Sequence, residues 1–270
     1  MLTHDFAEML LKDFDNRTPS ASFGLPNLEL SIEQCYEVQY AIASLRKQRG
    51  EQIVGYKIGC TSDTVQRQMG ITHPIFGRVW NTEKHESGCK LAISMFDHLA
   101  IEGELAVTIE EDIPCSSWLT DNPEVMRDMR PVIELHNKIF YASAEKRAGE
   151  LIANNAIHAG IVCSSNPISS DAANNIFNLK VFRNDELIGE TLIDHFKSRI
   201  VRAVAQLVDH LALHGERLLK DHIVLTGSML PLWNVGSQDI ITVTGGGADR
   251  ICCFFEGSRS HNQLSSQTGG

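Results

Sequence analysis

Residues 101–107 read Ile101-Glu102-Gly103-Glu104-Leu105-Ala106-Val107, an apolar run that carries two carboxylates. An apolar run of this kind predicts a β-strand, which we extend to Ile109. Successive side chains of a strand point to opposite faces, so Glu102 and Glu104 should point to the same side. Two neighbouring carboxylates repel each other, and in a partly buried site they need a cation to stay ionised. The pattern also fits an exposed polar strand face, and alone it leaves both interpretations open.

A third carboxylate lies in another apolar run, Pro131-Val132-Ile133-Glu134-Leu135. A lone carboxylate is costly to bury, so Glu134 needs a partner. Three carboxylates with no cysteine among them suit a hard cation such as Mg²⁺ or Mn²⁺. Such an ion takes about six ligands, so three glutamates leave positions for a bidentate substrate and water. We therefore predict a divalent-metal site formed by Glu102, Glu104 and Glu134.

A single lysine lies between glycines in the apolar run Val54-Gly55-Tyr56-Lys57-Ile58-Gly59. The ordinary interpretation is a lysine that extends to the surface while its methylene chain packs on the strand. The functional interpretation is a buried ammonium that stabilises negative charge on a substrate. The flanking glycines would let backbone and substrate approach each other closely.

The rest of the chain predicts a mixed fold with many short strands. Ser31 and Gln34 form a predicted capping box, followed by an apolar helical stripe that Gly50 ends. A second helical stripe precedes Gly215, and shorter helices are predicted at 123–129 and 142–152. Residues 180–188 predict a hairpin that turns at Asn184-Asp185. Further strands are predicted at 132–135, 161–163, 179–182, 223–225, 240–243 and 251–255.

These patterns predict three regions of the chain. Residues 1–50 should form a helical N-terminal segment, and residues 51–258 a mixed-β catalytic body of the α+β class. Residues 259–270, rich in Ser, Gln and Gly, should form a mobile tail.

Composition limits the class of protein. The chain has 270 residues, of which 43% are hydrophobic, enough for a sizeable core. Its formal net charge is −10, from 24 basic and 34 acidic residues. That negative field repels phosphate backbones, so we expect no nucleic-acid partner. A local cation can still attract a small organic anion into a pocket.

The N-terminal residues, the apolar runs and the cysteines indicate where the protein is located. The first residues contain no basic segment followed by an apolar stretch, so we expect no signal peptide. We expect no membrane partner either, because no apolar run approaches the roughly 20 residues of a membrane helix. The seven cysteines are scattered, with no Cys-x-x-Cys pair, so they predict neither a disulfide framework nor a zinc site. Scattered thiols indicate a cytoplasmic protein.

The motifs together resemble the hydratase/decarboxylase branch of the fumarylacetoacetate hydrolase superfamily, which includes 2-oxopent-4-enoate hydratases and 4-oxalocrotonate decarboxylases. The resemblance extends from about Ile53 to Phe255 and rests on the order and spacing of several segments. These are Gly-Tyr-Lys-Ile-Gly at 55–59 with Thr61, Ser62 and Gln66, Pro74-Ile75-Phe76-Gly77, Glu102-Gly103-Glu104-Leu105-Ala106, Pro131-Val132-Ile133-Glu134, Ala153-Asn154-Asn155-Ala156 with Ala159-Gly160, and Val224-Leu225-Thr226-Gly227-Ser228.

The resemblance implies a fold and roles for individual residues. It implies a mixed β roll of the fumarylacetoacetase C-terminal type, assembled into a homo-oligomer. Lys57 matches the lysine that contacts the bound 2-oxo acid, and the three glutamates match the metal ligands. Thr226, Gly227 and Ser228 match a loop that lines the same pocket.

Two positions depart from the family pattern. Ile75 stands where relatives commonly carry an acidic residue, a candidate for proton transfer that isoleucine cannot replace. Asn154 stands at a position often occupied by aspartate. His73 is one candidate substitute for the missing acid, on strand alternation alone. His136, two residues after Glu134, is a better candidate for an outer partner of the metal ligands, whereas we expect a structural role for His158.

The expected activity is a metal-assisted enolisation of a 2-oxo acid, in which the metal acts as a Lewis acid and Lys57 adds charge stabilisation. A hydratase of the 2-oxopent-4-enoate type is the first interpretation, and a 4-oxalocrotonate-type decarboxylase is the second. A carbon–carbon bond hydrolase of the acylpyruvate type is disfavoured, because we identify no N-terminal lid segment that carries a His-Glu pair. A protein that binds metal and ligand with weak or lost activity stays open, and turnover would distinguish it.

Overall fold

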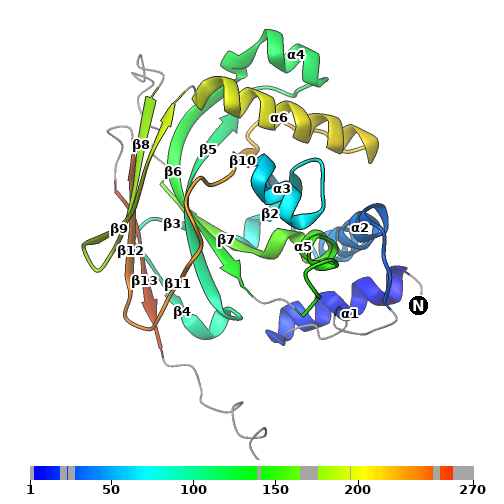
Figure 1. The fold of residues 1–270 in the computed structure, drawn as a ribbon, viewed down its shortest axis with the longest axis horizontal. Coiled ribbons are helices and arrows are strands. Elements are labelled where there is room, and N and C mark those ends of the chain that lie inside the picture. Colours follow the sequence, from blue (N-terminus) through cyan, green and yellow to red (C-terminus); the bar gives the residue numbers. More distant parts are fainter. Residues whose placement is uncertain are drawn as a thin grey trace, which may run out of the picture.

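The computed structural model describes residues 3–18, 23, 28–138, 141–164, 176–194, 196–245 and 250–257. Two curved β-sheets lie next to each other, and helices cover the other side of the larger sheet (Figure 1). This arrangement confirms the expected α+β fold. The predicted tail at 259–270 lies outside the described residues. None of the described helices is long and apolar enough to span a bilayer.

The larger sheet carries the predicted site. Within the described residues its strand order is β2-β1-β10-β5-β6-β7-β3, with β11 paired to β5. Most neighbours are antiparallel, whereas β1 pairs with β10 and β3 with β7 in parallel. The strands are β1 (Ile53–Gly59), β2 (Ile75–Trp80), β3 (Lys84–Glu86), β5 (Leu99–Ile109), β6 (Met126–Asn137), β7 (His158–Cys163), β10 (Ile223–Leu225) and β11 (Trp233–Asn234).

The smaller sheet packs on one face of the larger sheet and closes the main hydrophobic core. Its order is β4-β13-β12-β8-β9, from β4 (Cys89–Ala92), β8 (Ile176–Arg183), β9 (Glu186–Asp194), β12 (Ile240–Gly245) and β13 (Ile251–Glu256). Ile101 and Leu105 of β5 enter this core. Gly103 faces it too, because a Cβ there would lie 2.4 Å from a methyl group of Val181. Side chains alternate along β5, so Glu102 and Glu104 face the opposite, helical side.

The helical side has its own hydrophobic cluster. It is built by α1 (Thr3–Asn16), α2 (Ile32–Gln48) and α5 (Arg147–Ala153), which Figure 1 shows on the far side of the larger sheet from β8 and β9. The predicted capping box forms at the start of α2, where Ser31 accepts from the backbone of Gln34 and Gln34 accepts in return. The remaining helices are α3 (Asp63–Met69), α4 (Ser116–Asp121) and α6 (Phe196–Leu213).

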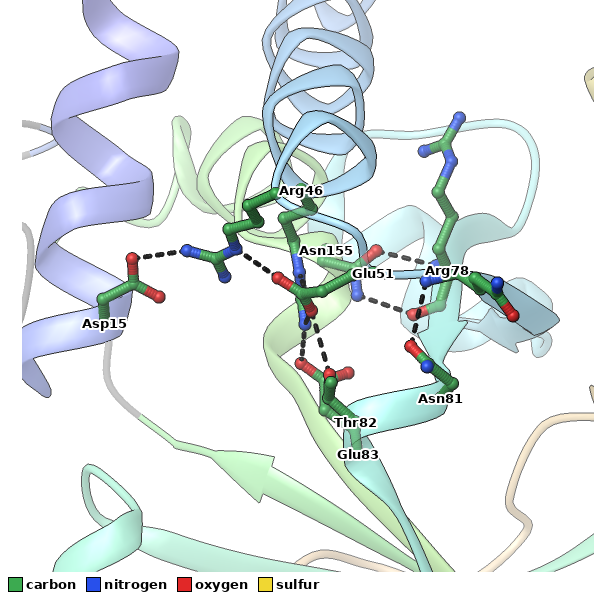
Figure 2. Close-up of polar contacts among 10 residues, drawn as sticks. Asp15, Arg46, Glu51, Arg78, Asn81, Thr82, Glu83 and Asn155 are labelled. Carbon is green, nitrogen blue, oxygen red and sulfur yellow. Dashed lines mark hydrogen bonds and ion pairs between the residues drawn. The ribbon is translucent and has the colours of Figure 1, made fainter.

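Ion pairs join α2 to the segments next to β1 and β2, and the end of α2 to α1 (Figure 2). Arg46 of α2 contacts Glu51 at 2.5 Å and Glu83 at 2.6 Å, and all three side chains are buried. Arg49 reaches Asp15 of α1 at 2.6 Å. Burying an arginine requires such paired acceptors, because an unpaired buried charge is strongly destabilising. The helices therefore hold a fixed position above the site-bearing face.

Several predicted elements are confirmed and others are wrong. The predicted strands appear, often longer than expected, and the hairpin turns at Asn184 and Asp185, which both have positive φ. The helix predicted at 123–129 is wrong: a single 3-10 turn, Pro123–Val125, leads directly into β6. The helix expected at 142–152 is shorter and ends one residue later, as α5. The boundary near residue 50 falls between α2 and β1, and the division into separate units stays a prediction.

Candidate metal centre

The pairing of β5 with β6 brings the three glutamates together. Glu102 lies directly opposite Glu134 in the antiparallel register, and Glu104 lies opposite Val132. Opposite residues of a strand pair share a face, so the three carboxylates gather on the helical side of the sheet. Glu104 and Glu134 are each 1% exposed. This burial contradicts the interpretation of residues 101–107 as an exposed polar strand.

The two oxygens of Glu134 have different surroundings. Its Oε1 lies 2.8 Å from the Lys57 ammonium and 2.7 Å from Nδ1 of His158. Lys57 is 4% exposed, so its side chain does not extend to the surface. Two partners on one oxygen fix the orientation of the carboxylate, as outer partners of a metal ligand commonly do.

Oε2 of Glu134 has no hydrogen-bond partner among the described residues, although it is buried. It lies 3.3 Å from Nε2 of His136, and the same nitrogen lies 3.4 Å from Oε2 of Glu102. One donor atom each from Glu102, Glu134 and His136 lie within 4.8 Å of one another. Buried ligand atoms that converge without hydrogen-bond partners indicate a site for a further atom between them. The donor set therefore fits a divalent cation.

The buried ionisable groups of this cluster shift each other's pKa values. Burial, reinforced by Glu134 and Glu102, raises the pKa of Glu104 well above its usual range. Burial also opposes charge on Glu134, but Lys57 and His136 outweigh it and hold the pKa of Glu134 well below its usual range. The carboxylates likewise raise the pKa of Lys57 and of His136 despite their burial. Without a cation, the raised pKa of Glu104 favours its protonated form, whereas the lowered pKa of Glu134 favours its ionised form.

This distribution predicts that metal affinity rises with pH. A cation binds the ionised form of Glu104, so below the raised pKa of Glu104 each ion that binds must displace its proton. The dissociation constant for Mn²⁺ should fall by about tenfold per pH unit for each proton displaced. Calorimetric titrations at several pH values, in buffers of different ionisation enthalpy, would measure both the constant and the protons released. An affinity that does not vary with pH would contradict a protonated Glu104.

A left-handed turn above the cluster supplies another contact to Lys57. Asn155, Ala156 and Ile157 have consecutive φ values of 54°, 53° and 55°. Such a run is strained for residues with side chains, above all for β-branched Ile157. The Asn155 amide holds the turn against β2 by accepting from the backbone of Arg78 and donating back to it. As a result, the Ala156 carbonyl oxygen lies 3.3 Å from the Lys57 ammonium.

The predicted pocket loop is attached to β5. Thr226 donates its hydroxyl to the Leu105 carbonyl, and Ser228 donates to the Gly103 carbonyl. The backbone N–H of Gly227 donates to Oε1 of Glu104. Gly227 has φ +97°, and a Cβ there would lie 2.5 Å from a methyl group of Thr61, so a glycine is required.

The loop and Glu104 line a common cavity. The segment after β1, the strands β8 and β9, and α6 also contribute to its walls. The polar side chains that line it are those of Thr61, Glu104, Arg199, Arg202, Gln206, Thr226 and Ser228. The cavity therefore lies on the Glu104 side of the cluster. The Thr226 hydroxyl hydrogen is already donated to β5, which leaves the Thr226 oxygen as an acceptor, whereas the Ser228 oxygen already accepts from the backbone N–H of Leu230.

The structure separates the remaining predicted residues. His136 belongs to the cluster, but His73 does not: its ring contacts the Pro74 carbonyl at 2.9 Å. Ile75 pairs with Gly59 across β1 and β2, which places it on the same face as Lys57. It is fully buried in the helical cluster. Asn154 ends α5.

Sequence reasoning missed His158. We expected a structural role, whereas its ring is buried and contacts the Glu134 carboxylate directly. The sequence spacing between 134 and 158 contains no signal for this contact. It depends on β7 lying next to β6, with an irregularity in register at Leu135 and His136.

The fold and the cluster define a protein with a buried acidic centre suited to a divalent cation. No family model matches the chain. It is 26% identical to 2-keto-4-pentenoate hydratase of Burkholderia vietnamiensis over 199 residues, which are 73% of this chain and 76% of that protein. It is 25% identical to 2-oxo-hept-4-ene-1,7-dioate hydratase of Escherichia coli over 234 residues, 84% of this chain and 88% of that protein.

The structure is also similar to 4-oxalocrotonate decarboxylase from Pseudomonas putida G7, complexed with magnesium and adipate. The TM-score is 0.81 at 22% identity, and the match covers 94% of this chain and 97% of the other. The chain is thus similar in sequence to 2-oxo acid hydratases, and it shares its fold with this decarboxylase. The expected family resemblance and fold are therefore confirmed.

Proposed function

We propose that this protein is a divalent-metal-dependent lyase that acts on a 2-oxo acid, with hydration of a 2-oxopent-4-enoate-type substrate as the first candidate reaction. One observation carries the proposal: unpartnered, buried donor atoms of Glu134 and His136 converge with Glu102 beside the buried Lys57. The hydratases and the decarboxylase similar to this chain support the reaction class. Glu102, Glu104 and Glu134 are the proposed metal ligands, with Mg²⁺ or Mn²⁺ as the ion.

Each group near the cluster has a task in such a reaction. The bound cation would supply a Lewis acid for the carboxylate and 2-oxo oxygens of the substrate. Lys57 provides a fixed positive charge for the anion that develops on enolisation, and its contacts with Glu134 and Ala156 fix its position. The loop at Thr226–Ser228 forms a wall of the cavity, and Gly227 orients the Glu104 carboxylate.

Two observations favour decarboxylation as the second candidate. Ile75 places an apolar side chain on the face of Lys57, where it cannot transfer a proton to or from a water molecule. In addition, Arg199 and Arg202 line the cavity that also contains Glu104. Two guanidinium groups in this cavity suit the far carboxylate of a dicarboxylic substrate, as in 4-oxalocrotonate.

One assay tests both candidates. Chelator-treated protein is given Mn²⁺ or Mg²⁺ with either 2-hydroxypenta-2,4-dienoate or 4-oxalocrotonate, and dienol absorbance and released CO₂ are followed. We expect metal-dependent loss of the monocarboxylate dienol without CO₂ for a hydratase, and CO₂ from the dicarboxylate for a decarboxylase. A protein that binds metal and ligand without turning over either substrate would contradict both and indicate lost activity.

We also propose a homo-oligomer in the cytoplasm. Leu187 and Leu192 are exposed on β9, which ends the smaller sheet, and an apolar edge strand is a common place for subunit contact. The seven cysteines are free, which fits a reducing compartment.

A further inference from the structure

We infer that His136 is itself a ligand of the cation, so that the site prefers first-row transition-metal ions, above all Co²⁺, to Mg²⁺. This inference rests on the metal site of the proposed function. It adds a nitrogen ligand to a centre that three glutamates would otherwise supply with oxygen alone.

The backbone places His136 for this role. Glu134 and His136 are two residues apart on β6, so their side chains leave the strand on the same face. The residue opposite His136 on β5 is Ala100, whose small side chain leaves space for the imidazole ring. The ring is 2% exposed. His136 is therefore held in the wall of the cluster and points toward the carboxylates.

The contacts of the ring do not account for its burial. Nε2 lies within 3.4 Å of carboxylate oxygens on both Glu102 and Glu134, yet neither ring nitrogen has a hydrogen bond of acceptable geometry among the described residues. A buried imidazole normally satisfies its nitrogens. A nitrogen that is close to two carboxylate oxygens but aligned with neither is placed to share a third atom with them.

The competing explanation is that a protonated His136 is a fixed counter-ion that replaces the metal. A protonated ring would leave two buried N–H groups without an aligned acceptor. A neutral ring bound to a cation through Nε2 leaves only the Nδ1 hydrogen. The observed geometry therefore favours the ligand over the counter-ion.

A nitrogen ligand changes which ion binds best. Mg²⁺ favours oxygen ligands, whereas an imidazole ligand favours first-row transition-metal ions, with affinity lowest for Mn²⁺ and rising through Fe²⁺ to Co²⁺ along the Irving–Williams order. Three carboxylates and one imidazole would still leave positions of a six-coordinate ion open for substrate or water. This donor set predicts a stronger preference for Co²⁺ over Mg²⁺ than a purely carboxylate site would have.

Pulsed electron paramagnetic resonance on the Mn²⁺-loaded wild-type protein tests the inference without relying on activity or on a variant. We expect modulation from one directly bound ¹⁴N nucleus, replaced by the ¹⁵N pattern when the protein carries ¹⁵N-labelled histidine. Bound Mn²⁺ without nitrogen coupling would overturn the inference and leave the proposed function intact. No bound Mn²⁺ at all would overturn the metal site itself, and the proposed function with it.

A variant then identifies the histidine. In His136→Leu we expect the nitrogen modulation to disappear and Co²⁺ affinity to fall more than about a hundredfold, beyond the usual effect of an outer partner. Mg²⁺ affinity should fall by less than about tenfold, because the carboxylates remain. His73→Leu, whose ring lies outside the cluster, is the matched control and should change neither. Nitrogen coupling that persists in His136→Leu would assign the ligand to another histidine and refute the role of His136.

Discussion

Replacing Lys57 with methionine should lower kcat about a hundredfold, the usual size of losing one electrostatic stabiliser of a developing anion. Methionine keeps the length and apolar stem of lysine but removes the charge, which lies 2.8 Å from Glu134. Metal affinity should stay the same or increase, because the variant removes a positive charge next to the ion. Steady-state kinetics at saturating Mn²⁺ measures the first effect, and calorimetry measures the second.

The control for this variant is Lys84→Met, at an exposed lysine of β3. It should keep wild-type kcat, and the melting curves of both variants would verify that they fold. His158 still contacts Glu134 in the Lys57 variant, so the carboxylate keeps one buried partner. Wild-type turnover in folded Lys57→Met protein would assign the lysine to a purely structural ion pair.

Glu104→Gln should remove most of the thermal stabilisation that Mn²⁺ gives to the wild-type protein. An ion at about a hundred times its dissociation constant stabilises a fold by about 2.7 kcal/mol, worth several degrees in a chain of this size. The variant should lose that gain because glutamine offers no carboxylate to the ion. Thermal unfolding with and without Mn²⁺ measures the difference.

Without metal, the Glu104→Gln variant should be as stable as the wild-type protein or more stable. Because the pKa of Glu104 is raised in the folded protein, its ionised form is destabilising, and this effect grows as pH rises above the usual carboxyl range. Glutamine resembles the protonated form and removes that penalty. Glu86→Gln, at an exposed carboxylate of β3, should leave both the metal-free stability and the Mn²⁺ gain unchanged. An unchanged Mn²⁺ gain in Glu104→Gln would exclude Glu104 as a ligand.

The strands that carry the site follow directly from the sequence. Apolar runs at 101–109 and 132–135 predict β5 and β6, and alternation predicts that Glu102 and Glu104 share a face. The apolar runs do not determine the register between the two strands. A one-residue slip would send Glu134 into the core between the sheets. The observed pairing of Glu102 with Glu134 depends on the whole sheet. The family resemblance predicts that the three glutamates meet at one metal site, but it does not predict this pairing.

The elements that sequence reasoning missed share a physical reason. Helix α3 has its N-terminal cap at Ser62 and a left-handed Gly70 after its last turn, yet it buries none of its residues. Because α3 has no apolar stripe, its sequence shows no helical periodicity from which the helix could be predicted. Residues 126–129 were expected to be helical, but Met126 and Arg127 pair with the end of β5, so sheet formation overrides the local preference.

The contacts of His136 and His158 illustrate the same limit at the site. Both rings meet Glu134, one from the same strand and one from the neighbouring strand. Strand alternation is enough to predict that His136 lies near Glu134. No local pattern predicts His158, because its position depends on how β7 follows the left-handed turn at 155–157 and pairs with β6.

Calorimetric titration of the chelator-treated wild-type protein with Mn²⁺ tests the central claim most directly. The cluster of Glu102, Glu104 and Glu134 beside Lys57 and His136 predicts saturable binding of one ion per chain, with protons released on binding. The absence of saturable binding up to millimolar Mn²⁺ would contradict the account, and the cluster would then be a buried charge network that Lys57 and His136 neutralise without a metal.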